Sequence, residues 1–497
     1  MKSILIERSL FFFHNSFYIM GSVILILLGY FISRITANND IYMQLLAVDG
    51  IINSFDFSGV GGHPIGIALI GTFIRLIGAD PLLVLFYLQP VFCAFCFIIL
   101  LKLLKKVLPN NYAFFISLNA MLSLVLIKAM NQVSAEIISL AAVLYFLLYV
   151  WDVIIIKEKE NNTHFIILVL LSWITILLRN ASIFIILGVL VFIFQQKIYK
   201  TLKFSLLSLL LLFPGILKSM ISVDNNSSLE NILSIKAPMI FYDQIIKHIK
   251  NLVEIVIPYN LHLNKFPEIK LVIGLSCVVF CLVNFFYNNI HVNKISRKNI
   301  MADFFLTVGL SYFFFLSLAS VYLGDTSIYS TDWGNIYRVS GFGILFLLCA
   351  FWIYIKNLKN LKRKFVFYVL LLLCFGKLSY GLRYEILASN TRLFFSDYRT
   401  IGNSVKNYMI GTEDNEKLLI YTFGSHQGKN LYYILKYYNF LNPLTFKIDN
   451  LTEFNHTDNA VKLCAYSDLE TFSKAKYEAQ SIDNFRAIYL LHLKQPS

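Results

Sequence analysis

The chain has 497 residues, of which 57% are hydrophobic and only 14% are charged, and its mean hydropathy is +0.66. Soluble domains are about half apolar and about a quarter charged, so this composition excludes a protein whose main solvent is water. The formal net charge of +14 does not indicate nucleic-acid binding, because the lysines are scattered between apolar runs instead of clustered in one polar domain. The sequence predicts an integral membrane protein.

Apolar runs that approach the length of a membrane span, about 20 residues, recur along the chain. The first of them is too long for a signal-peptide core and has no small-residue cleavage site before Arg34, so we expect it to remain as the first span. We predict about eleven transmembrane helices, near residues 11–33, 81–101, 112–127, 137–156, 164–178, 181–195, 202–217, 269–287, 301–322, 339–355 and 365–382.

The basic residues divide unequally between the two sides of these spans. With the N-terminus in the cytoplasm, the cytoplasmic segments carry Lys2, Arg8, Lys102, Lys105, Lys106, Lys157, Lys159, Lys197, Lys200, Lys203, Lys294, Arg297, Lys298, Lys356, Lys359, Lys362, Arg363 and Lys364. The short segments on the other side carry only Arg34, Arg75, Lys128, Arg179 and Arg338. The positive-inside rule therefore predicts a cytoplasmic N-terminus, and an odd number of spans places residues 384–497 outside.

The chain divides into two predicted domains. Residues 1–383 form a transmembrane domain with two long outer loops, 34–80 and 218–268. Residues 384–497 form a small extracytoplasmic α/β domain, with apolar strands at 417–423, 444–448, 460–466 and 487–493 and helices at 429–438 and 469–479. The predicted fold class is a polytopic α-helical membrane protein with a small C-terminal α/β domain.

The outer loop at 34–80 has the most informative polar sequence. Apolar residues recur there at helical spacing, at Ile41, Leu45, Val48 and Ile52, which predicts one amphipathic helix over residues 40–53 on the outer membrane surface. Pro64 suits the first turn of a second such helix that continues through Ile77. His63, just before Pro64, is either a functional residue or a polar turn residue.

Two carboxylates in this loop are candidates for chemistry. In a single straight helix, nine residues turn the face by about 180°, so Asp40 and Asp49 cannot both point at one site. Asp40 lies at the membrane boundary beside the first span, whereas Asp49 precedes the helix-ending Gly50. We choose Asp40 and keep Asp49 as the alternative. Asp40 also suits an ordinary helix N-cap, and Asp49 suits a solvated surface residue.

Further charged residues lie at outward membrane edges. They are Lys128 and Glu136 around the second short loop, Arg179 in the third, and Arg338 at the start of a late apolar span. Charges near the membrane are costly unless they are paired or reach water. Lys128 and Arg179 can also snorkel to the headgroups, and Arg338 can grip a lipid phosphate or anchor its helix.

These elements together resemble the GT-C superfamily of membrane glycosyltransferases, which includes protein O-mannosyltransferases and bacterial aminoarabinose transferases. The resemblance covers most of the chain. It is carried by Asp40 after the first span, the amphipathic helix ending near Gly50, Gly62-His63-Pro64, Ser134-Ala135-Glu136 opening the fourth span, Arg179 after the fifth, and Tyr337-Arg338 opening a late span.

The resemblance implies an enzyme that transfers a sugar from a polyprenyl-phosphate donor to a glycan, lipid or protein acceptor of the cell envelope. Asp40 would be the general base for the acceptor hydroxyl, in an inverting displacement. His63, Lys128, Glu136, Arg179 and Arg338 would form the substrate-binding set, with the cations near the donor phosphate. The resemblance places the protein in the inner or plasma membrane.

The chain departs from the family at two positions. The family often has a second carboxylate beside its catalytic Asp and a Pro after its His-Pro, but here Asn39 and Ile41 flank Asp40, and Ile65 follows Pro64. The missing carboxylate weakens the case for a divalent metal in this loop. Six of the seven cysteines lie inside apolar runs without zinc-site spacing, so we predict no metal ligands and no certain cofactor.

Two other functions were weighed against transfer. A membrane glycan polymerase or ligase would depend on arginines in a long outer loop, but residues 218–268 contain no arginine. A transporter or flippase for lipid-linked glycans often shows paired repeats and broken helices, and the sequence shows neither. Both remain alternatives to the glycosyltransferase.

Overall fold

A computed structural model describes most of the apolar part of the chain and the strands near its C-terminus. The described residues are 2–32, 39–57, 64–123, 126, 129–130, 133–156, 162–196, 210–213, 237–257, 265–291, 297–323, 333–358, 363–392, 417–421, 436, 445–448, 460–465, 477–481 and 488–493. The chain divides into two compact units, Met1–Ser33 with Tyr87–Tyr384 and Arg34–Phe86 with Glu385–Ser497.

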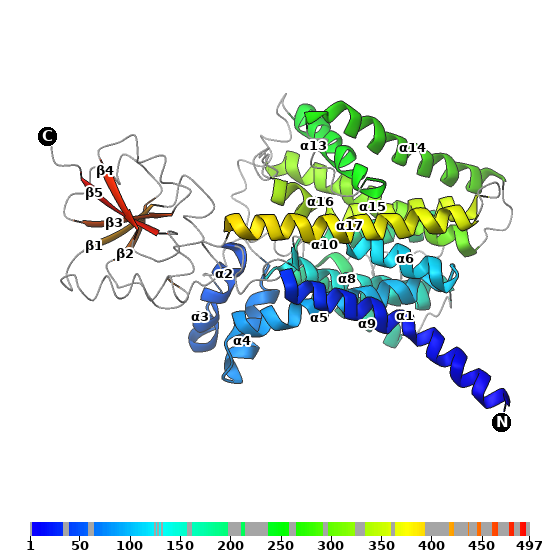
Figure 1. The fold of residues 1–497 in the computed structure, drawn as a ribbon, viewed down its shortest axis with the longest axis horizontal. Helices are drawn as coiled ribbons and strands as arrows, with labels where there is room; N and C mark the ends of the chain where they lie inside the picture. Colours follow the sequence, from blue (N-terminus) through cyan, green and yellow to red (C-terminus); the bar gives the residue numbers. More distant parts are fainter. Residues whose placement is uncertain are drawn as a thin grey trace. The chain divides into compact units, whose positions relative to one another are not determined.

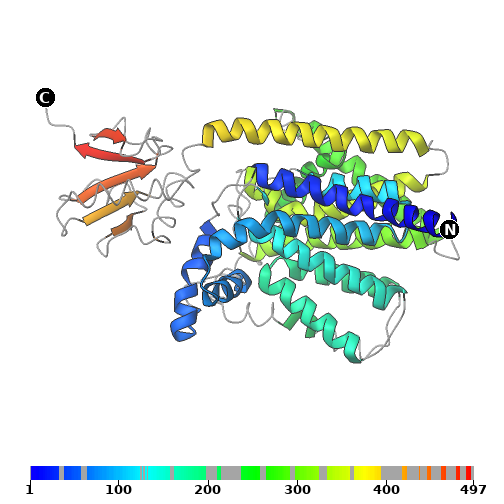
Figure 2. The same cartoon turned by 60° about the horizontal axis from the view of Figure 1, so that its bottom comes forward.

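The first unit is built of helices whose axes run side by side (Figure 1, Figure 2). They are α1 (Lys2–Ile32), α5 (Pro81–Leu104), α6 (Asn110–Met121), α8 (Ala135–Val150), η2 (Trp151–Ile156), α9 (Asn162–Leu178), α10 (Ser182–Gln195), α13 (Ala237–Asn251), η3 (Leu252–Ile255), α14 (Pro267–His291), α15 (Arg297–Leu323), α16 (Trp333–Asn357) and α17 (Arg363–Arg392). Within the described residues, four helical stretches are long and apolar enough to cross a membrane: Pro81–Leu104, Ala135–Val153, Pro267–Tyr287 and Asn299–Val321. The chain is a multi-pass helical membrane protein.

Ten of the eleven predicted spans coincide with these helices. Most of the remaining one, at residues 202–217, lies outside the described residues, and only 210–213 are described there, as helix. The total number of spans therefore stays a prediction. The six cysteines of the apolar runs are buried, as predicted.

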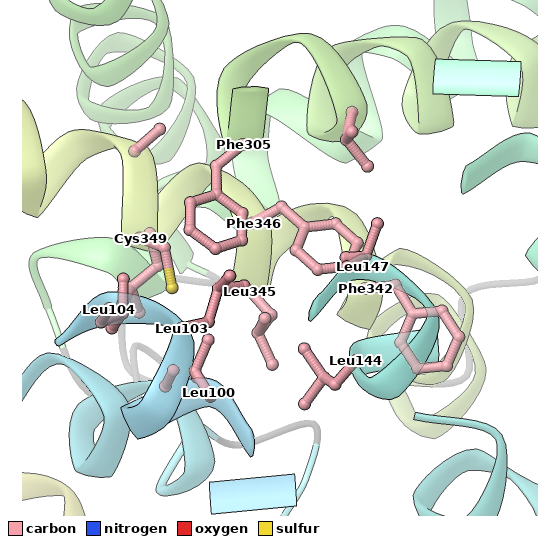
Figure 3. Packing of buried hydrophobic residues seen from close by; sticks show 14 of the residues in the cluster. Leu100, Leu103, Leu104, Leu144, Leu147, Phe305, Phe342, Leu345, Phe346 and Cys349 are labelled. Carbon is pink, nitrogen blue, oxygen red and sulfur yellow. The ribbon is translucent and has the colours of Figure 1, made fainter. Parts of the chain in front are cut away.

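The core of the first unit is apolar and rich in aromatic rings. Leu100 of α5, Leu144 of α8, Phe305 of α15 and Phe346 of α16 meet in it (Figure 3). The rings of Phe305 and Phe346 stack with centroids 6.0 Å apart. Interlocked side chains of this kind favour helix contact through close packing, which matters in a membrane because lipid chains are as apolar as the core.

In the second unit, residues 39–77 form three short helices instead of the two that we expected. They are α2 (Asn39–Leu46), α3 (Val48–Ser54) and α4 (Gly66–Leu76). The helix predicted over 40–53 is assigned as two helices that meet at Ala47, although helical hydrogen bonds continue across that residue, from Ala47 N–H to Met43 O and from Ile51 N–H to Ala47 O. The opposite directions predicted for Asp40 and Asp49 therefore stay a prediction. Pro64 precedes the N-cap residue Ile65 and so does not stand in the first turn.

The apolar faces of these short helices pack against each other. Ile41, Leu45, Val48 and Ile51 are buried. Gly71 of α4 allows close approach, since a Cβ atom there would stand 2.9 Å from Leu45 Cδ2 and 3.0 Å from Val48 Cγ2. The amphipathic pattern was therefore read correctly, although part of it packs α2 and α3 onto α4.

The C-terminal part of the second unit contains a five-stranded mixed sheet in the order β2-β1-β3-β5-β4. The strands are β1 (Lys417–Tyr421), β2 (Thr445–Ile448), β3 (Ala460–Ala465), β4 (Tyr477–Ser481) and β5 (Ile488–Leu493). β1 pairs in parallel with β2 and β3, and β5 is antiparallel to β3 and β4.

The four predicted strands are confirmed. The helix predicted at 469–479 was wrong at its end, because Tyr477–Ser481 is strand β4. This strand pairs with β5 along its whole length. Apart from residue 436, the helix predicted at 429–438 lies outside the described residues. The α/β class of this domain therefore stays a prediction, and so does the division of the chain at residue 383.

Candidate functional site

Two of the predicted substrate-binding residues, Glu136 and Arg179, meet in a buried ion pair. Arg179 Nη1 lies 3.4 Å from Glu136 Oε1, and the two side chains are only 12% and 6% exposed. They are 43 positions apart in the sequence and come from different helices. The structure thus joins two charges that the sequence treated separately.

The ends of two helices favour this pair. Glu136 stands in the first turn of α8, where the positive end of the helix dipole stabilises a carboxylate, and Arg179 follows the last turn of α9, where the negative end stabilises a cation. The backbone N–H of Arg179 donates to Thr175 O, 3.1 Å away, so the residue still continues the helical hydrogen-bond pattern.

A buried glutamine positions the start of α8. Gln89 of α5 accepts from the backbone N–H of Ser134 at 2.8 Å and donates through Nε2 to Ala129 O at 2.6 Å. The Ser134 hydroxyl donates to the same carbonyl at 3.0 Å. Gln89 therefore ties the loop before α8 to α5. This loop fixes the start of α8 and so the direction in which the Glu136 side chain projects from it.

Arg179 also faces an aromatic ring of α16. Its guanidinium carbon lies 4.9 Å from the centroid of Phe342, a cation–π geometry. Phe342 belongs to the buried core (Figure 3). Arg338, another predicted phosphate contact, is four residues earlier in α16 and so one helical turn from Phe342. The backbone of α16 therefore brings position 338 close to the level of the Glu136–Arg179 pair.

The alternative carboxylate, Asp49, lies in an exposed ion pair of the second unit. Its Oδ1 is 3.7 Å from Arg75 Nε, and the Asp49 side chain is 69% exposed. This pair ties α3 to α4 and supports the reading of Asp49 as a solvated surface residue.

The other predicted site residues are described in part or not at all. Asp40 is the second residue of α2 and Arg338 lies in the second turn of α16, but in both cases only the backbone is described. His63 and Lys128 lie outside the described residues. The roles predicted for these four residues therefore stay predictions.

Our sequence reasoning missed a second group of buried charges. Glu254 of η3, Lys270 of α14 and Lys377 of α17 are 0%, 5% and 0% exposed, and Glu254 interacts electrostatically with both lysines. A signal for Lys377 was present, since it is a lysine inside the apolar run 365–382 and such residues are functional candidates by default. Among the described residues, no three His, Cys, Asp or Glu side chains gather as a metal site would require.

Comparisons with known proteins give matches among solved structures alone. No protein-family model and no curated protein matches this chain. It is similar to ArnT from Cupriavidus metallidurans bound to undecaprenyl phosphate, with a TM-score of 0.40 and 9% identity over 97% of this chain and 100% of that one. For apo ArnT from the same organism the TM-score is 0.39, with 8% identity over 95% and 96%.

A third similar structure is the oligosaccharyltransferase of Archaeoglobus fulgidus in complex with Zn and sulfate. Its TM-score is 0.43, with 10% identity over 91% of this chain and 68% of that one. All three TM-scores lie below 0.5, and the function is therefore inferred from this chain's own residues.

Proposed function

We propose that this protein is a membrane glycosyltransferase that transfers a sugar from a polyprenyl-phosphate donor to an acceptor of the cell envelope on the outer side of the membrane. The single observation that carries the proposal is the buried Glu136–Arg179 pair. Glu136 opens the fourth predicted span and Arg179 follows the fifth, where the resemblance implies a substrate-binding acid and a cation.

The pair suits a role in holding a phosphate. An arginine guanidinium is always charged and presents five N–H donors in a planar fork, of which a carboxylate occupies at most two. Glu136 can therefore orient Arg179 without occupying every N–H donor of its guanidinium. Phe342 limits the rotation of the guanidinium further, since the cation lies over its ring. Glu136 is thus a positioning residue for Arg179.

The proposed reaction is a single displacement with inversion. The acceptor hydroxyl oxygen forms a bond to the anomeric carbon as the bond from that carbon to the phosphate oxygen breaks. Asp40 takes the hydroxyl proton, and the electron pair of the broken bond leaves with the polyprenyl phosphate. Arg179, Arg338, Lys128 and His63 stabilise the charge that develops on the phosphate.

The proposal is tested by transfer assays with membranes that contain the full chain and a radiolabelled polyprenyl-phosphate sugar. Asp40→Asn nearly preserves size and can still cap a helix, so we expect normal expression and a loss of about 10²–10⁴-fold, the usual contribution of a general base. Asp49→Asn is the matched control, and it should cost far less because Asp49 lies in an exposed pair with Arg75.

The phosphate contacts are tested in the same assay. Arg338→Lys and Arg179→Lys keep the charge but lose the planar fork, so both should weaken use of the donor.

Full activity of Asp40→Asn together with an inactive Asp49→Asn would move the base to Asp49. If the labelled lipid crosses the vesicle membrane and no sugar is transferred, the protein is a flippase and not a transferase.

A further inference from the structure

Gln89 of α5 bridges two points of the loop before α8 with both ends of its side-chain amide. Its Oε1 accepts from the backbone N–H of Ser134 at 2.8 Å, and its Nε2 donates to Ala129 O at 2.6 Å. The side chain is only 2% exposed. A buried amide is costly unless both its oxygen and its N–H groups have partners, so these hydrogen bonds hold Gln89 and the loop in one arrangement.

The start of α8 depends on this bridge, because the helix has no side-chain cap at its N-terminus. Ser134 is the N-cap residue, but its side chain makes no cap hydrogen bond. A serine at this position usually accepts from a backbone N–H of the first helical turn, whereas the Ser134 hydroxyl donates to Ala129 O at 3.0 Å. The contact with Gln89 therefore holds the first turn of α8, which contains Glu136.

A second contact holds Arg179 to α8. The hydroxyl oxygens of Ser139 in α8 and Ser182 in α10 lie 3.4 Å apart, and both serines are fully buried. Each serine follows one member of the Glu136–Arg179 pair by one helical turn of sequence, and the backbone N–H of Ser182 donates to Arg179 O at 3.0 Å. A shift of the start of α8 would therefore displace Glu136 and Arg179 together.

The segment of α5 that carries Gln89 also lies close to α1. A Cβ atom at Gly29 of α1 would stand 2.7 Å from Pro90 Cβ, next to Gln89 in the chain. α1 and α5 are the two helices that the outer loop 34–80, with Asp40, connects. Gln89 therefore fixes the place of the buried ion pair relative to the two helices from which the loop of the proposed base extends.

We propose that Gln89 is a positioning residue for donor binding, because it places the Glu136–Arg179 pair and thereby the guanidinium that binds the donor phosphate. The inference rests on the proposed function and assigns to Gln89 no contact with the substrate. Binding and reaction depend steeply on position, since a misplacement of about 1 Å can cost about 10²-fold in rate. Loss of the bridge should raise the KM for the donor, an effect that a smaller amount of folded protein cannot produce.

The test measures the donor KM and kcat in membranes that contain the full chain, with a radiolabelled polyprenyl-phosphate sugar. Gln89→Leu removes both hydrogen bonds with a side chain of similar size, and we expect a donor KM about tenfold higher. Polyprenyl phosphate without a sugar serves as the inhibitor. Its inhibition constant should rise by the same factor, because the affected contact is with the phosphate.

Gln89→Glu gives an intermediate case. Its carboxylate still accepts from the Ser134 N–H but cannot donate to Ala129 O, so its effect on the donor KM should be smaller than that of Gln89→Leu. Because Gln89→Glu keeps one of the two hydrogen bonds, it also provides the test if Gln89→Leu does not fold.

Cys96→Ala is the matched control on the same face of α5. Cys96 lies two helical turns after Gln89 and is fully buried, and its Sγ donates to Ile137 O of α8 at 3.7 Å. The variant therefore loosens the contact between α5 and α8 but leaves the bridge to the loop intact. We expect a lower thermal midpoint, as for Gln89→Leu, with an unchanged donor KM and an unchanged inhibition constant.

The coupling between Gln89 and Arg179 separates positioning from general damage. In the Arg179→Lys background the phosphate contact is already weakened, so Gln89→Leu should raise the donor KM much less there than in the unmodified chain. Equal effects in the two backgrounds would overturn the positioning role. An unchanged donor KM in Arg179→Lys would overturn it too, because the contact to be positioned would not exist.

The remaining outcomes distinguish this inference from the proposed function. If the unmodified chain transfers no sugar, the proposed function is wrong and the role of Gln89 is wrong with it. If the unmodified chain transfers sugar and Arg179→Lys raises the donor KM, but both Gln89 variants keep the normal KM and inhibition constant, only the positioning role of Gln89 is wrong.

Discussion

At the scale of single residues, the Glu136–Arg179 pair should behave as a buried unit. Removing one partner of a buried ion pair costs about 3–5 kcal/mol, because it leaves the other charge buried without compensation. We therefore expect Arg179→Met and Glu136→Gln each to lower the thermal midpoint clearly. The double variant should recover much of the loss, since neither charge then remains.

The exposed Asp49–Arg75 pair is the matched control for this cycle. Its two side chains are 69% and 41% exposed, and exposed pairs contribute only about 0–1 kcal/mol. Arg75→Met should therefore change the midpoint little. Additive losses in the Glu136–Arg179 double variant would show that the two side chains do not act as a unit.

At the scale of elements, the contact between α13 and α14 depends on a glycine. Alanine in place of glycine inside a helix usually stabilises it by about 1 kcal/mol. At Gly274 the added Cβ would stand 1.9 Å from a backbone oxygen of α13, and backbone atoms cannot yield as a side chain does. We expect Gly274→Ala to push α13 away from α14 and to lower the thermal midpoint in spite of the better propensity.

The control for Gly274 lies two residues along the same helix. Ser276 is exposed, and its hydroxyl donates only to Val272 O of its own helix, so Ser276→Ala should leave the midpoint nearly unchanged. An unchanged or raised midpoint in Gly274→Ala would mean that the two helices do not approach as closely as the structure places them.

At the scale of the whole molecule, the distribution of basic residues predicts opposite sides of the membrane for residue 364 and the C-terminus. Reporters that are active on one side only, fused after Lys364 and after Ser497, should give opposite signals, because one span separates these positions. Two cytoplasmic signals would contradict the odd number of spans. The assignment of Asp40, Glu136 and Arg179 to the outer side of the membrane would then be wrong as well.

Sequence alone determined the helical membrane class, the positions of most described helices of the first unit and four of the five strands. These features depend on composition and on the spacing of neighbouring residues, both of which are local. β4 was missed because Tyr477–Ser481 contains none of the β-branched residues that favour strands, and its strand conformation comes from pairing with β5. The irregularity at Ala47, where α2 ends and α3 begins, was also missed, since an apolar repeat does not report small changes in helix geometry.

The sequence also indicated Glu136 and Arg179 as candidates, but only the tertiary structure decided that they form one pair. Their contact depends on how α8 and α9 pack, and no spacing between residues 136 and 179 predicts that. The same holds for α13, whose buried face is polar. Its buried His248 stacks on Phe313 of α15, with ring centroids 4.7 Å apart, and this contact depends on helix packing that hydropathy does not predict.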